Sequence, residues 1–349
     1  MLIEEIFISR NDIIRDAVKK LDITSKQILI VVEEKKLLGT VTDGDIRRWI
    51  LKNGNLDIEV YNIMNKEPTY LYIGKKHLAR QVMKEKHKEA IPILDSNRNV
   101  IDVVFWNENF EYEFKYDKKI SNPVVIMAGG KGTRLYPYTK ILPKPLIPIG
   151  ELSITERIIN RFTRFGCRDF FLTVNYKKNM IKAYFDELEK NYEISYVEEE
   201  KFLGTGGSLS LLKGELNETF FVSNCDILVE ANYSNILKYH KDNNNLITMV
   251  TSLKNYKIPY GIIKLSDDGQ VIGTTEKPEY DYLVNTGFYI LEPETLDDVP
   301  KNTFFHITDL INKYIEEGKK VGTYPISENS WLDMGEMKEM DRMIERLDV

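Results

Sequence analysis

The sequence predicts two domains, an α+β domain over residues 1–115 and an α/β domain with a mixed sheet over residues 123–349. Three observations predict this fold class. The first 110 residues contain a weak internal repeat, strand and helix patterns alternate after Pro123, and 42% of the 349 residues are apolar. A chain of this length and composition can bury more than one core.

The composition also excludes several classes of protein. The longest apolar run, residues 28–32, is far shorter than the roughly 18 residues that a membrane span needs. Glu4 and Glu5 stand where a secretory leader would be basic, so we expect a cytoplasmic protein without a membrane partner. The net charge of -6 argues against nucleic acid as a partner. Cys167 and Cys225 form no CxxC pair, the four histidines form no zinc motif, and we expect reduced, buried thiols.

The N-terminal repeat consists of a strand, a turn and a strand, once over residues 29–41 and again about 62 residues later over 91–104. Each copy follows a helical stretch, residues 13–21 in the first and 77–87 in the second, and a further helix starts near Ile46. Neither β-α-β-β-α copy can close a core alone, so we expect the two to pack against each other. Residues 108–122 are polar and aromatic, and we predict a linker there.

The second domain starts with a buried strand, residues 124–127, and a helix between the capping box of Ser153 and Glu156 and its end at Gly166. A turn at residues 267–269 predicts a hairpin over 261–275 that is added to a parallel sheet. Further strands are expected over residues 170–174, 192–197, 220–223, 246–252 and 284–291, and helices over 178–190, 207–212, 232–241, 308–317 and 337–347.

The most informative segment follows the first of these strands. Gly129, Gly130 and Gly132 let backbone N–H groups approach phosphate oxygens, and Arg134 and Lys144 add positive charge. The segment has neither the GxxxxGK[ST] spacing of a Walker loop nor the third glycine of a dinucleotide-binding GxGxxG. Residues 128–148 together resemble the opening pattern of the sugar-nucleotide pyrophosphorylases, LAGGxGTRLxPxTxxxPKPxxPI.

The resemblance extends over about residues 123–345, because later landmarks of the family follow in order. It implies a Rossmann-like mixed sheet of the GT-A type, nucleotide contacts in the opening and GTGG turns, and sugar and phosphate contacts in the EKP and NxG segments. It also implies Mg2+ on the aspartates of the NxD and WxDxG segments. The implied nucleotide-binding residues are Ala128, Gly129, Gly130, Gly132, Thr133, Gly204, Thr205 and Gly206; the sugar-phosphate residues are Glu276, Lys277, Asn285 and Gly287; the metal ligands are Asp226 and Asp333. Cys225 replaces the family's usual glycine.

The reaction of this family agrees with these residue types. A sugar 1-phosphate that attacks the α-phosphorus of a nucleoside triphosphate brings two polyanions together, so catalysis needs positioning and neutralisation of charge. Arg134, Lys144 and Mg2+ held by Asp226 and Asp333 could supply that charge without a covalent intermediate. We therefore predict catalytic roles for Arg134, Lys144 and Asp226.

The N-terminal repeat resembles a tandem pair of CBS motifs, a regulatory module that commonly binds adenine nucleotides. Thr42 and Asp45 match that family's contacts to phosphate and ribose, whereas the second copy has Asp102, Phe105 and Glu108 at its three key positions. The resemblance implies at most one intact adenine nucleotide site. A purely structural or dimerising module is the alternative, and a homo-oligomer is expected.

CBS motifs in front of a sugar nucleotidyltransferase resemble the glucosamine-1-phosphate guanylyltransferases of the bacterial legionaminic-acid pathway. This arrangement favours GTP and glucosamine 1-phosphate as substrates. The alternatives are a mannose- or heptose-1-phosphate guanylyltransferase, a cytidylyltransferase that acts on a non-sugar phosphate, and a catalytically inactive nucleotide sensor. No residue of the sequence decides the base or the sugar.

Overall fold

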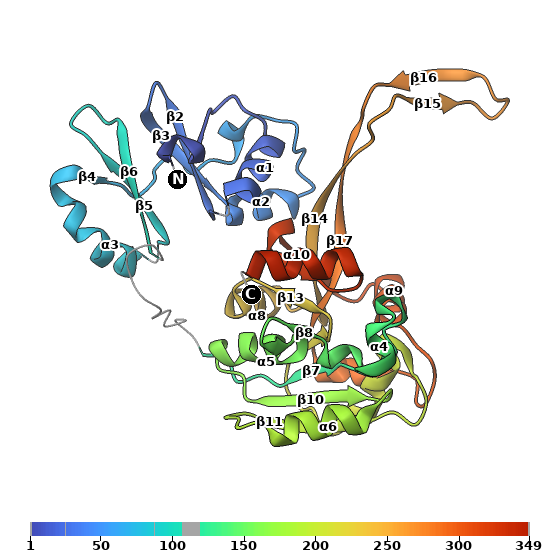
Figure 1. Ribbon diagram of the computed structural model, residues 1–349. Helices are drawn as coiled ribbons and strands as arrows, with labels where there is room; N and C mark the ends of the chain where they lie inside the picture. Colours follow the sequence, from blue (N-terminus) through green and yellow to red (C-terminus); the bar gives the residue numbers. More distant parts are fainter. Residues whose placement is uncertain (1, 25, 87, 107–118, 348–349) are drawn as a thin grey trace. The chain divides into compact units, whose positions relative to one another are not determined.

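The computed structural model describes residues 2–24, 26–86, 88–106 and 119–347, and the chain divides into two compact units, 1–115 and 116–349 (Figure 1). Most of the predicted linker, including Glu108, lies outside the described residues. Ile120 is buried, and the Asn122 side-chain amide donates to the carbonyl oxygen of Thr219 at 2.7 Å. The last residues of the predicted linker therefore pack into the second unit.

The first unit contains two three-stranded sheets of the same topology, β1-β2-β3 and β4-β5-β6. In both, the first strand runs parallel to the middle strand and the third runs antiparallel to it. A bulge lies at Val31/Val32 in one sheet and at Ile93/Leu94 in the other, the same step of 62 residues as in the sequence. The predicted repeat is confirmed. The elements are β1 (Phe7–Ile8), α1 (Ile14–Thr24), β2 (Ile28–Glu33), β3 (Lys36–Thr42), α2 (Asp43–Ile50), β4 (Leu71–Tyr72), α3 (Ala79–Lys86), β5 (Ala90–Leu94) and β6 (Val100–Phe105).

The two copies share a hydrophobic core, as expected. Ile30 and Val41 of the first copy belong to the same buried cluster as Leu94 and Val103 of the second. The backbone N–H of Val100 also donates to the carbonyl oxygen of Lys35 at 2.9 Å. Burial of apolar surface between the copies therefore stabilises a fold that neither could form alone.

The second unit is built on a seven-stranded sheet in the order β11-β10-β7-β12-β17-β14-β18. β17 is antiparallel to both of its neighbours, whereas the other pairs run parallel, so the mixed α/β sheet is as predicted. The strands of the sheet are β7 (Val124–Met127), β10 (Asp169–Val174), β11 (Glu193–Glu198), β12 (Phe220–Asn224), β14 (Ile247–Lys257), β17 (Glu279–Leu291) and β18 (Val321–Ile326). Outside it lie β8 (Pro148–Ile149), β9 (Leu152–Ser153), β13 (Ile227–Val229), β15 (Ile262–Leu265), β16 (Val271–Thr275) and β19 (Trp331–Asp333). The helices are α4 (Tyr138–Ile141), α5 (Ile154–Phe165), α6 (Lys178–Glu187), α7 (Gly204–Gly207), α8 (Tyr233–Asp242), α9 (Ile307–Glu316) and α10 (Met337–Leu347).

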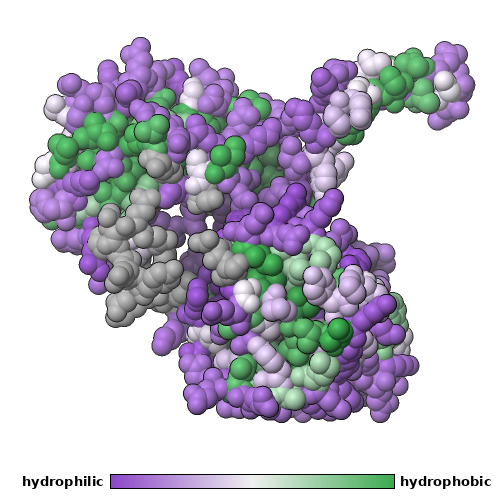
Figure 2. Space-filling view, viewed as in Figure 1, coloured by the Kyte–Doolittle hydropathy of each residue, from purple (hydrophilic) through white to green (hydrophobic). Residues whose placement is uncertain are grey.

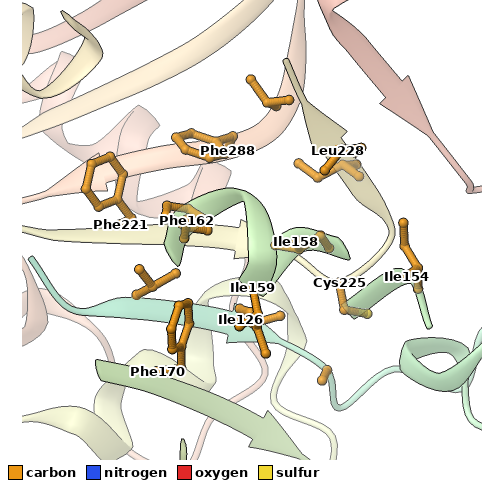
Figure 3. Packing of buried hydrophobic residues seen from close by; sticks show 14 of the residues in the cluster. Ile126, Ile154, Ile158, Ile159, Phe162, Phe170, Phe221, Cys225, Leu228 and Phe288 are labelled. Carbon is orange, nitrogen blue, oxygen red and sulfur yellow. The ribbon is translucent and has the colours of Figure 1, made fainter. Parts of the chain in front are cut away.

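Residues alternate along the central strands, so each face of the sheet has a core of its own. Val124 and Ile126 of β7 pack with α5, α6 and α8, whereas Val125 and Met127 pack with α9. On the first face, the ring of Phe162 from α5 lies 5.4 Å from Phe221 and 5.6 Å from Phe288, measured between centroids (Figure 3). These contacts fix the central strands, whose ends carry the candidate site.

Helix α5 begins and ends where the sequence predicts. The Ser153 hydroxyl accepts from the Glu156 N–H at 3.2 Å, and the Glu156 carboxylate accepts from the Ser153 N–H at 3.0 Å. Gly166 follows the last turn with φ +113°, a conformation that favours glycine. A capping residue of this kind stabilises a helix by about 1 kcal/mol.

The predicted hairpin over residues 261–275 turns at Gly269, but its addition to the main sheet is wrong. β15 and β16 pair only with each other in the described part of the chain. They stand at the tip of an extension in which β14 and β17 continue beyond the sheet, since β18 pairs with β14 only up to Ser252 (Figure 1). We call residues 253–283 the arm. Within the described ranges, no helix is long and apolar enough to cross a membrane.

Candidate active site

The candidate site lies where parallel strands of the main sheet end. β7 pairs with β10 and β12, so that Met127, the last residue of β7, lies opposite Thr173 and Asn224. The residues that follow these strands, from Ala128, Asn175 and Cys225 onward, therefore meet at one edge of the sheet. Ligands of open α/β sheets bind in this place.

The glycine-rich turn after β7 packs against Glu199 on one side and is open on the other. A Cβ atom on Gly129 would lie 2.5 Å from Oε1 of Glu199, whereas a Cβ atom on Gly130 would meet nothing within 4 Å. Gly132 has φ +64°, and its carbonyl oxygen accepts from the Thr139 hydroxyl at 2.8 Å. Gly130 thus faces open space, as a turn that binds phosphate must, while Gly129 and Gly132 pack against their surroundings.

Glu199 is the buried support of this turn. Its carboxylate accepts from the Leu203 N–H at 3.0 Å, and burial raises its pKa. The Asn175 side-chain amide donates to the Glu199 carbonyl oxygen at 2.8 Å. Sequence analysis did not single out Glu199, because the contact with Gly129 joins residues 70 positions apart. The only signal was its place between a strand and the GTGG turn.

Asp226 and Lys144 form an ion pair just beyond β12, and both side chains are almost buried. They lie 82 residues apart in the sequence, and the order β7-β12 in the sheet brings them together. A buried charge is costly unless it is paired, and here each ion pairs with the other.

Asp333 joins Asp226 through the pairing of β13 with β19, in which Ile227 lies opposite Asp333. The Met334 N–H donates to the Asp226 carbonyl oxygen at 2.8 Å, and the Gly335 N–H donates to Oδ1 of Asp333 at 2.7 Å. Burial and the charge of Asp226 raise the pKa of the Asp333 carboxyl, while Lys144 and Arg134 oppose the shift.

Arg134 completes the cluster from the glycine-rich segment. Its Nη1 lies 3.5 Å from the Cβ position of Gly335, beside Asp333. The structure therefore brings together Arg134 and Lys144 of the opening segment with Asp226 and Asp333, two cations and two carboxylates from three segments of the chain. The roles assigned to them remain predictions.

The residues present fit a divalent cation. Two neighbouring carboxylates repel each other, and a cation between them would relieve that repulsion. Mg2+ is usually held by one or two carboxylates together with water and substrate phosphates. Among the described residues there is no cluster of three or more His, Cys, Asp and Glu side chains suited to a metal, so a closed structural metal site is not indicated there.

Cys225, between Asn224 and Asp226, is buried like Cys167, and both thiols are free, as predicted. Burial raises the pKa of each thiol to about 12. A thiol that stays protonated at neutral pH is a poor nucleophile.

The GTGG turn, Gly204–Gly207, packs against the start of α9. The N–H groups of Gly206 and Gly207 donate to the carbonyl oxygen of Phe305 at 2.9 and 3.0 Å, and the Thr205 hydroxyl accepts from Ile307 at 3.4 Å. A Cβ atom on Gly204 would lie 2.6 Å from the Phe305 oxygen. These glycines are required by packing, and their contact with a nucleotide remains a prediction.

Asn285 and Gly287 lie beside the end of β12. Gly287 has φ +85°, and a Cβ atom on it would lie 2.4 Å from Nδ2 of Asn224. The Asn285 amide donates to the Tyr289 hydroxyl at 2.7 Å and its oxygen accepts from the Gly287 N–H at 3.0 Å. Both residues are thus near the strand end that carries Asp226.

Glu276 and Lys277 do not join them. Both side chains are exposed, in the arm, and roughly 20 Å of extended strand separates Glu279 from Asn285. The structure does not bring these two predicted sugar-phosphate residues to the acidic cluster.

Thr42 and Asp45 form the N-cap of α2 in the first unit. The Thr42 hydroxyl donates to Oδ2 of Asp45 at 2.6 Å, the Asp45 N–H donates back to Thr42 at 3.3 Å, and Arg48 pairs with Asp45. Of the second copy, Asp102 pairs with Lys76 and Phe105 is buried, while Glu108 lies outside the described residues. The capping role of Thr42 and Asp45 is observed, and their role in nucleotide binding stays a prediction.

The comparisons with known proteins agree with this arrangement. Residues 123–347 match the family model for nucleotidyl transferases, and residues 1–52 match that of the CBS domain. The chain belongs to the nucleotidyl transferase family. The predicted resemblance to sugar-nucleotide pyrophosphorylases with an N-terminal CBS domain is therefore confirmed, as is the prediction of an enzyme.

Several relatives show how wide this nucleotidyl transferase family is. The bifunctional protein GlmU of Methanococcus maripaludis is 35% identical over 221 residues, which are 60% of this chain and 51% of GlmU. Mannose-1-phosphate guanylyltransferase of Mycobacterium tuberculosis is 29% identical, over 62% of each chain. The chain thus spans about half the length of the GlmU relatives it matches. The crystal structure of HddC from Yersinia pseudotuberculosis has the same fold, with a TM-score of 0.52 and 23% identity over 65% of this chain and 99% of HddC.

Proposed function

We propose that the chain transfers GMP from GTP to a sugar 1-phosphate, with glucosamine 1-phosphate as the favoured acceptor, and releases pyrophosphate. The observation that supports this most strongly is the cluster of Arg134, Lys144, Asp226 and Asp333 next to the open glycine turn. The positive charges of this cluster suit a reaction between two polyanions, and that reaction needs no side-chain nucleophile.

In the proposed reaction, a phosphate oxygen of the sugar 1-phosphate attacks the α-phosphorus of the triphosphate. The bond from that phosphorus to the bridging oxygen breaks, and pyrophosphate leaves. Arg134 and Lys144 would neutralise charge on the α-phosphate and the leaving group, and the turn from Ala128 to Thr133 would hold the phosphates. Asp226 and Asp333 would hold Mg2+, which supplies further positive charge when bound.

Guanine is favoured by the domain arrangement, a CBS domain in front of a sugar nucleotidyltransferase. Glu199 is buried against the glycine turn and already accepts from the Leu203 N–H, so no role in base recognition is proposed for it. Two of the relatives carry the name mannose-1-phosphate guanylyltransferase, while another is a UTP–glucose-1-phosphate uridylyltransferase. The base preference is therefore the first thing to test.

The broader assignment follows from the domain arrangement. We propose that the product serves legionaminic-acid or other surface-glycan synthesis in the cytoplasm, and that an adenine nucleotide bound at Thr42 and Asp45 changes the rate. The predicted roles of Asn285 and Gly287 in sugar-phosphate binding are part of the same proposal, whereas Glu276 and Lys277 lie apart from the acidic cluster in the arm. Replacement of Asn285 by Ala tests this through the KM for the sugar phosphate.

The experiment is a panel of pyrophosphate release with Mg2+. GTP, dTTP, UTP, CTP and ATP are each paired with glucosamine, glucose, mannose, heptose and N-acetylglucosamine 1-phosphates and with phosphocholine. We expect the highest kcat/KM for GTP with glucosamine 1-phosphate. Turnover with phosphocholine would favour the cytidylyltransferase alternative, and nucleotide binding without any turnover would favour the sensor.

A further inference from the structure

Helix α4 ends with carbonyl groups that the helix itself cannot pair. In an α-helix, a carbonyl oxygen accepts a hydrogen bond from the N–H group four residues later. For Thr139 and Ile141 these later positions are Pro143 and Pro145, which have no N–H group. Donors for the last carbonyl groups of α4 must therefore come from another segment of the chain or from water.

Two consecutive residues that follow β10 supply these donors. The Tyr176 hydroxyl donates to the carbonyl oxygen of Thr139 at 3.2 Å. The Lys177 ammonium group donates to the carbonyl oxygens of Lys140 and Ile141 at 2.7 and 2.6 Å. A lysine is well suited to bind the final carbonyl groups of a helix. Tyr176 and Lys177 thus bind the last three carbonyl groups of α4 from a segment 36–37 positions further along the chain.

Few apolar contacts hold α4 in its place. Of its four residues only Thr139 is buried, whereas Tyr138 and Ile141 are 51% and 74% exposed. Hydrophobic residues are visible at the surface of the second unit in Figure 2. Because an isolated helix of so few residues does not form in water, the hydrogen bonds from Tyr176 and Lys177 are a main support of α4.

Helix α4 lies between the two predicted catalytic cations and contacts the glycine turn. Arg134 precedes the helix in the sequence and Lys144 follows it. The Thr139 hydroxyl donates to the carbonyl oxygen of Gly132 at 2.8 Å. A Cβ atom on Gly132 would lie 2.9 Å from Cγ2 of Thr139 and 3.0 Å from Cβ of Lys144. A movement of α4 would therefore move both cations relative to Asp226.

We propose that Lys177, together with Tyr176, is a positioning residue for nucleotidyl transfer. By holding α4, it keeps Arg134 and Lys144 where they neutralise charge on the reacting phosphates. This inference rests on the function proposed above, and Lys177 acts through α4 without touching the substrate. A misplacement of about 1 Å can slow a reaction about 100-fold, so the effect of Lys177 should appear mainly in kcat.

The first test is the steady-state rate of pyrophosphate release from GTP and glucosamine 1-phosphate. Lys177→Met removes the ammonium group, and Lys178→Met is the matched control, because Lys178 pairs with Glu198 and not with α4. We expect kcat to fall about tenfold or more in Lys177→Met, with a smaller change in the KM for GTP, and to be unchanged in the control. Lys177→Arg keeps a charged donor and should retain most of the activity.

Tyr176→Phe is the second variant, since it loses only a hydroxyl group and should fold even if Lys177→Met does not. We expect its kcat to fall about threefold or more at an unchanged unfolding temperature. A natural kcat in either Lys177→Met or Tyr176→Phe would overturn the proposal, as would an equal loss in Lys178→Met.

A double variant shows whether Lys177 acts through the catalytic lysine. If it does, Lys177→Met should lower kcat by at most about threefold when Lys144 is already replaced by Met, because residues that act together are not additive. The same tenfold loss in both backgrounds would overturn the proposal.

Hydrogen exchange of the backbone amides in residues 133–142 gives a readout that does not depend on turnover. We expect exchange to be about fivefold faster in Lys177→Met than in the natural protein, and unchanged in Lys178→Met. Equal exchange in Lys177→Met and the natural protein would overturn the positioning role. Absence of turnover in the natural protein would instead contradict the proposed function, so the two failures are distinguishable.

Discussion

The acidic cluster of the second unit and the helix cap of the first unit use the same residue types in opposite ways. Asp226 and Asp333 come from segments 107 positions apart and are held beside Lys144 and Arg134 at the ends of strands. Thr42 and Asp45 lie three residues apart and satisfy each other within one helical turn. Polar groups that long-range packing brings together at a strand end point to chemistry, whereas groups paired within one turn already have a structural task.

The largest expected effect tests the first side of this comparison. Asp226→Asn keeps the shape of the side chain and removes its charge, and we expect kcat/KM to fall by about 100- to 1,000-fold, as for loss of other electrostatic groups in active sites. Pyrophosphate release measures it. Asp169→Asn is the control, because Asp169 is exposed at the start of β10, the opposite end of that strand. Similar losses in both variants would contradict a special role for Asp226.

Two glycine variants separate the contribution of the turn to stability from its contribution to triphosphate binding. Gly129→Ala places a Cβ atom against Glu199, and we expect a loss of about 1–3 kcal/mol of unfolding free energy. Gly130→Ala meets nothing in the chain, so we expect unchanged stability and a KM for the triphosphate raised about tenfold or more. Thermal unfolding and steady-state kinetics give the two readouts. An unchanged KM in Gly130→Ala would argue against phosphate binding at this turn.

A smaller effect is expected at the helix cap. Thr42→Ala removes the side chain that caps α2, and we expect the first unit to lose about 1 kcal/mol of stability. Thr42→Ser keeps the hydroxyl and should retain most of that stability. Chemical denaturation followed by circular dichroism measures both. Adenine nucleotide affinity, measured by calorimetry on the same proteins, shows whether the cap also binds a ligand; equal affinity in both variants would leave Thr42 with a structural role alone.

The smallest effect concerns His240, a buried residue of α8 that belongs to neither site. Its Nδ1 lies 2.8 Å from the Thr248 hydroxyl and its Nε2 lies 3.0 Å from Glu292. Burial lowers its pKa below the ordinary histidine value of about 6.5, although Glu292 opposes the shift. The unfolded chain therefore binds the proton first, and stability should fall as the pH drops below about 6.5.

The measurement is the free energy of unfolding between pH 5 and pH 8, the range of histidine titration. We expect a shallower pH dependence in His240→Asn than in the natural protein, at a lower stability overall. His77→Asn, at an exposed position, is the matched variant and should keep the natural slope. Equal slopes in all three proteins would show that His240 does not carry the effect.

Local signals made most of the fold predictable. The capping box of Ser153, the glycine at 166 and the repeat of the first unit all act through neighbours in sequence. The arm was missed, although Tyr280 and Tyr282 alternate with Glu279 and Asp281, because so short a pattern does not show that the strand continues beyond the core and pairs there with residues 253–257.

In the candidate site, too, local motifs were predictable and long-range contacts were not. The glycine turn and the charged landmarks follow from an ordered motif, but the motif does not say which landmarks meet. Pairing of β13 with β19 decides that Asp333 joins Asp226, and the length of the arm decides that Glu276 and Lys277 lie apart. Glu199 gave no signal of its own, because its importance comes from the Gly129 backbone above it.

The central claim is that Asp226 and Asp333 together support Mg2+-dependent nucleotidyl transfer. The most direct measurement is pyrophosphate release from GTP and glucosamine 1-phosphate, with Mg2+ and with a chelator, by the natural protein and by Asp333→Asn. We predict release that requires Mg2+ and falls about 100-fold or more in the variant. Release that persists in the chelator, or that is equal in the two proteins, would contradict the account.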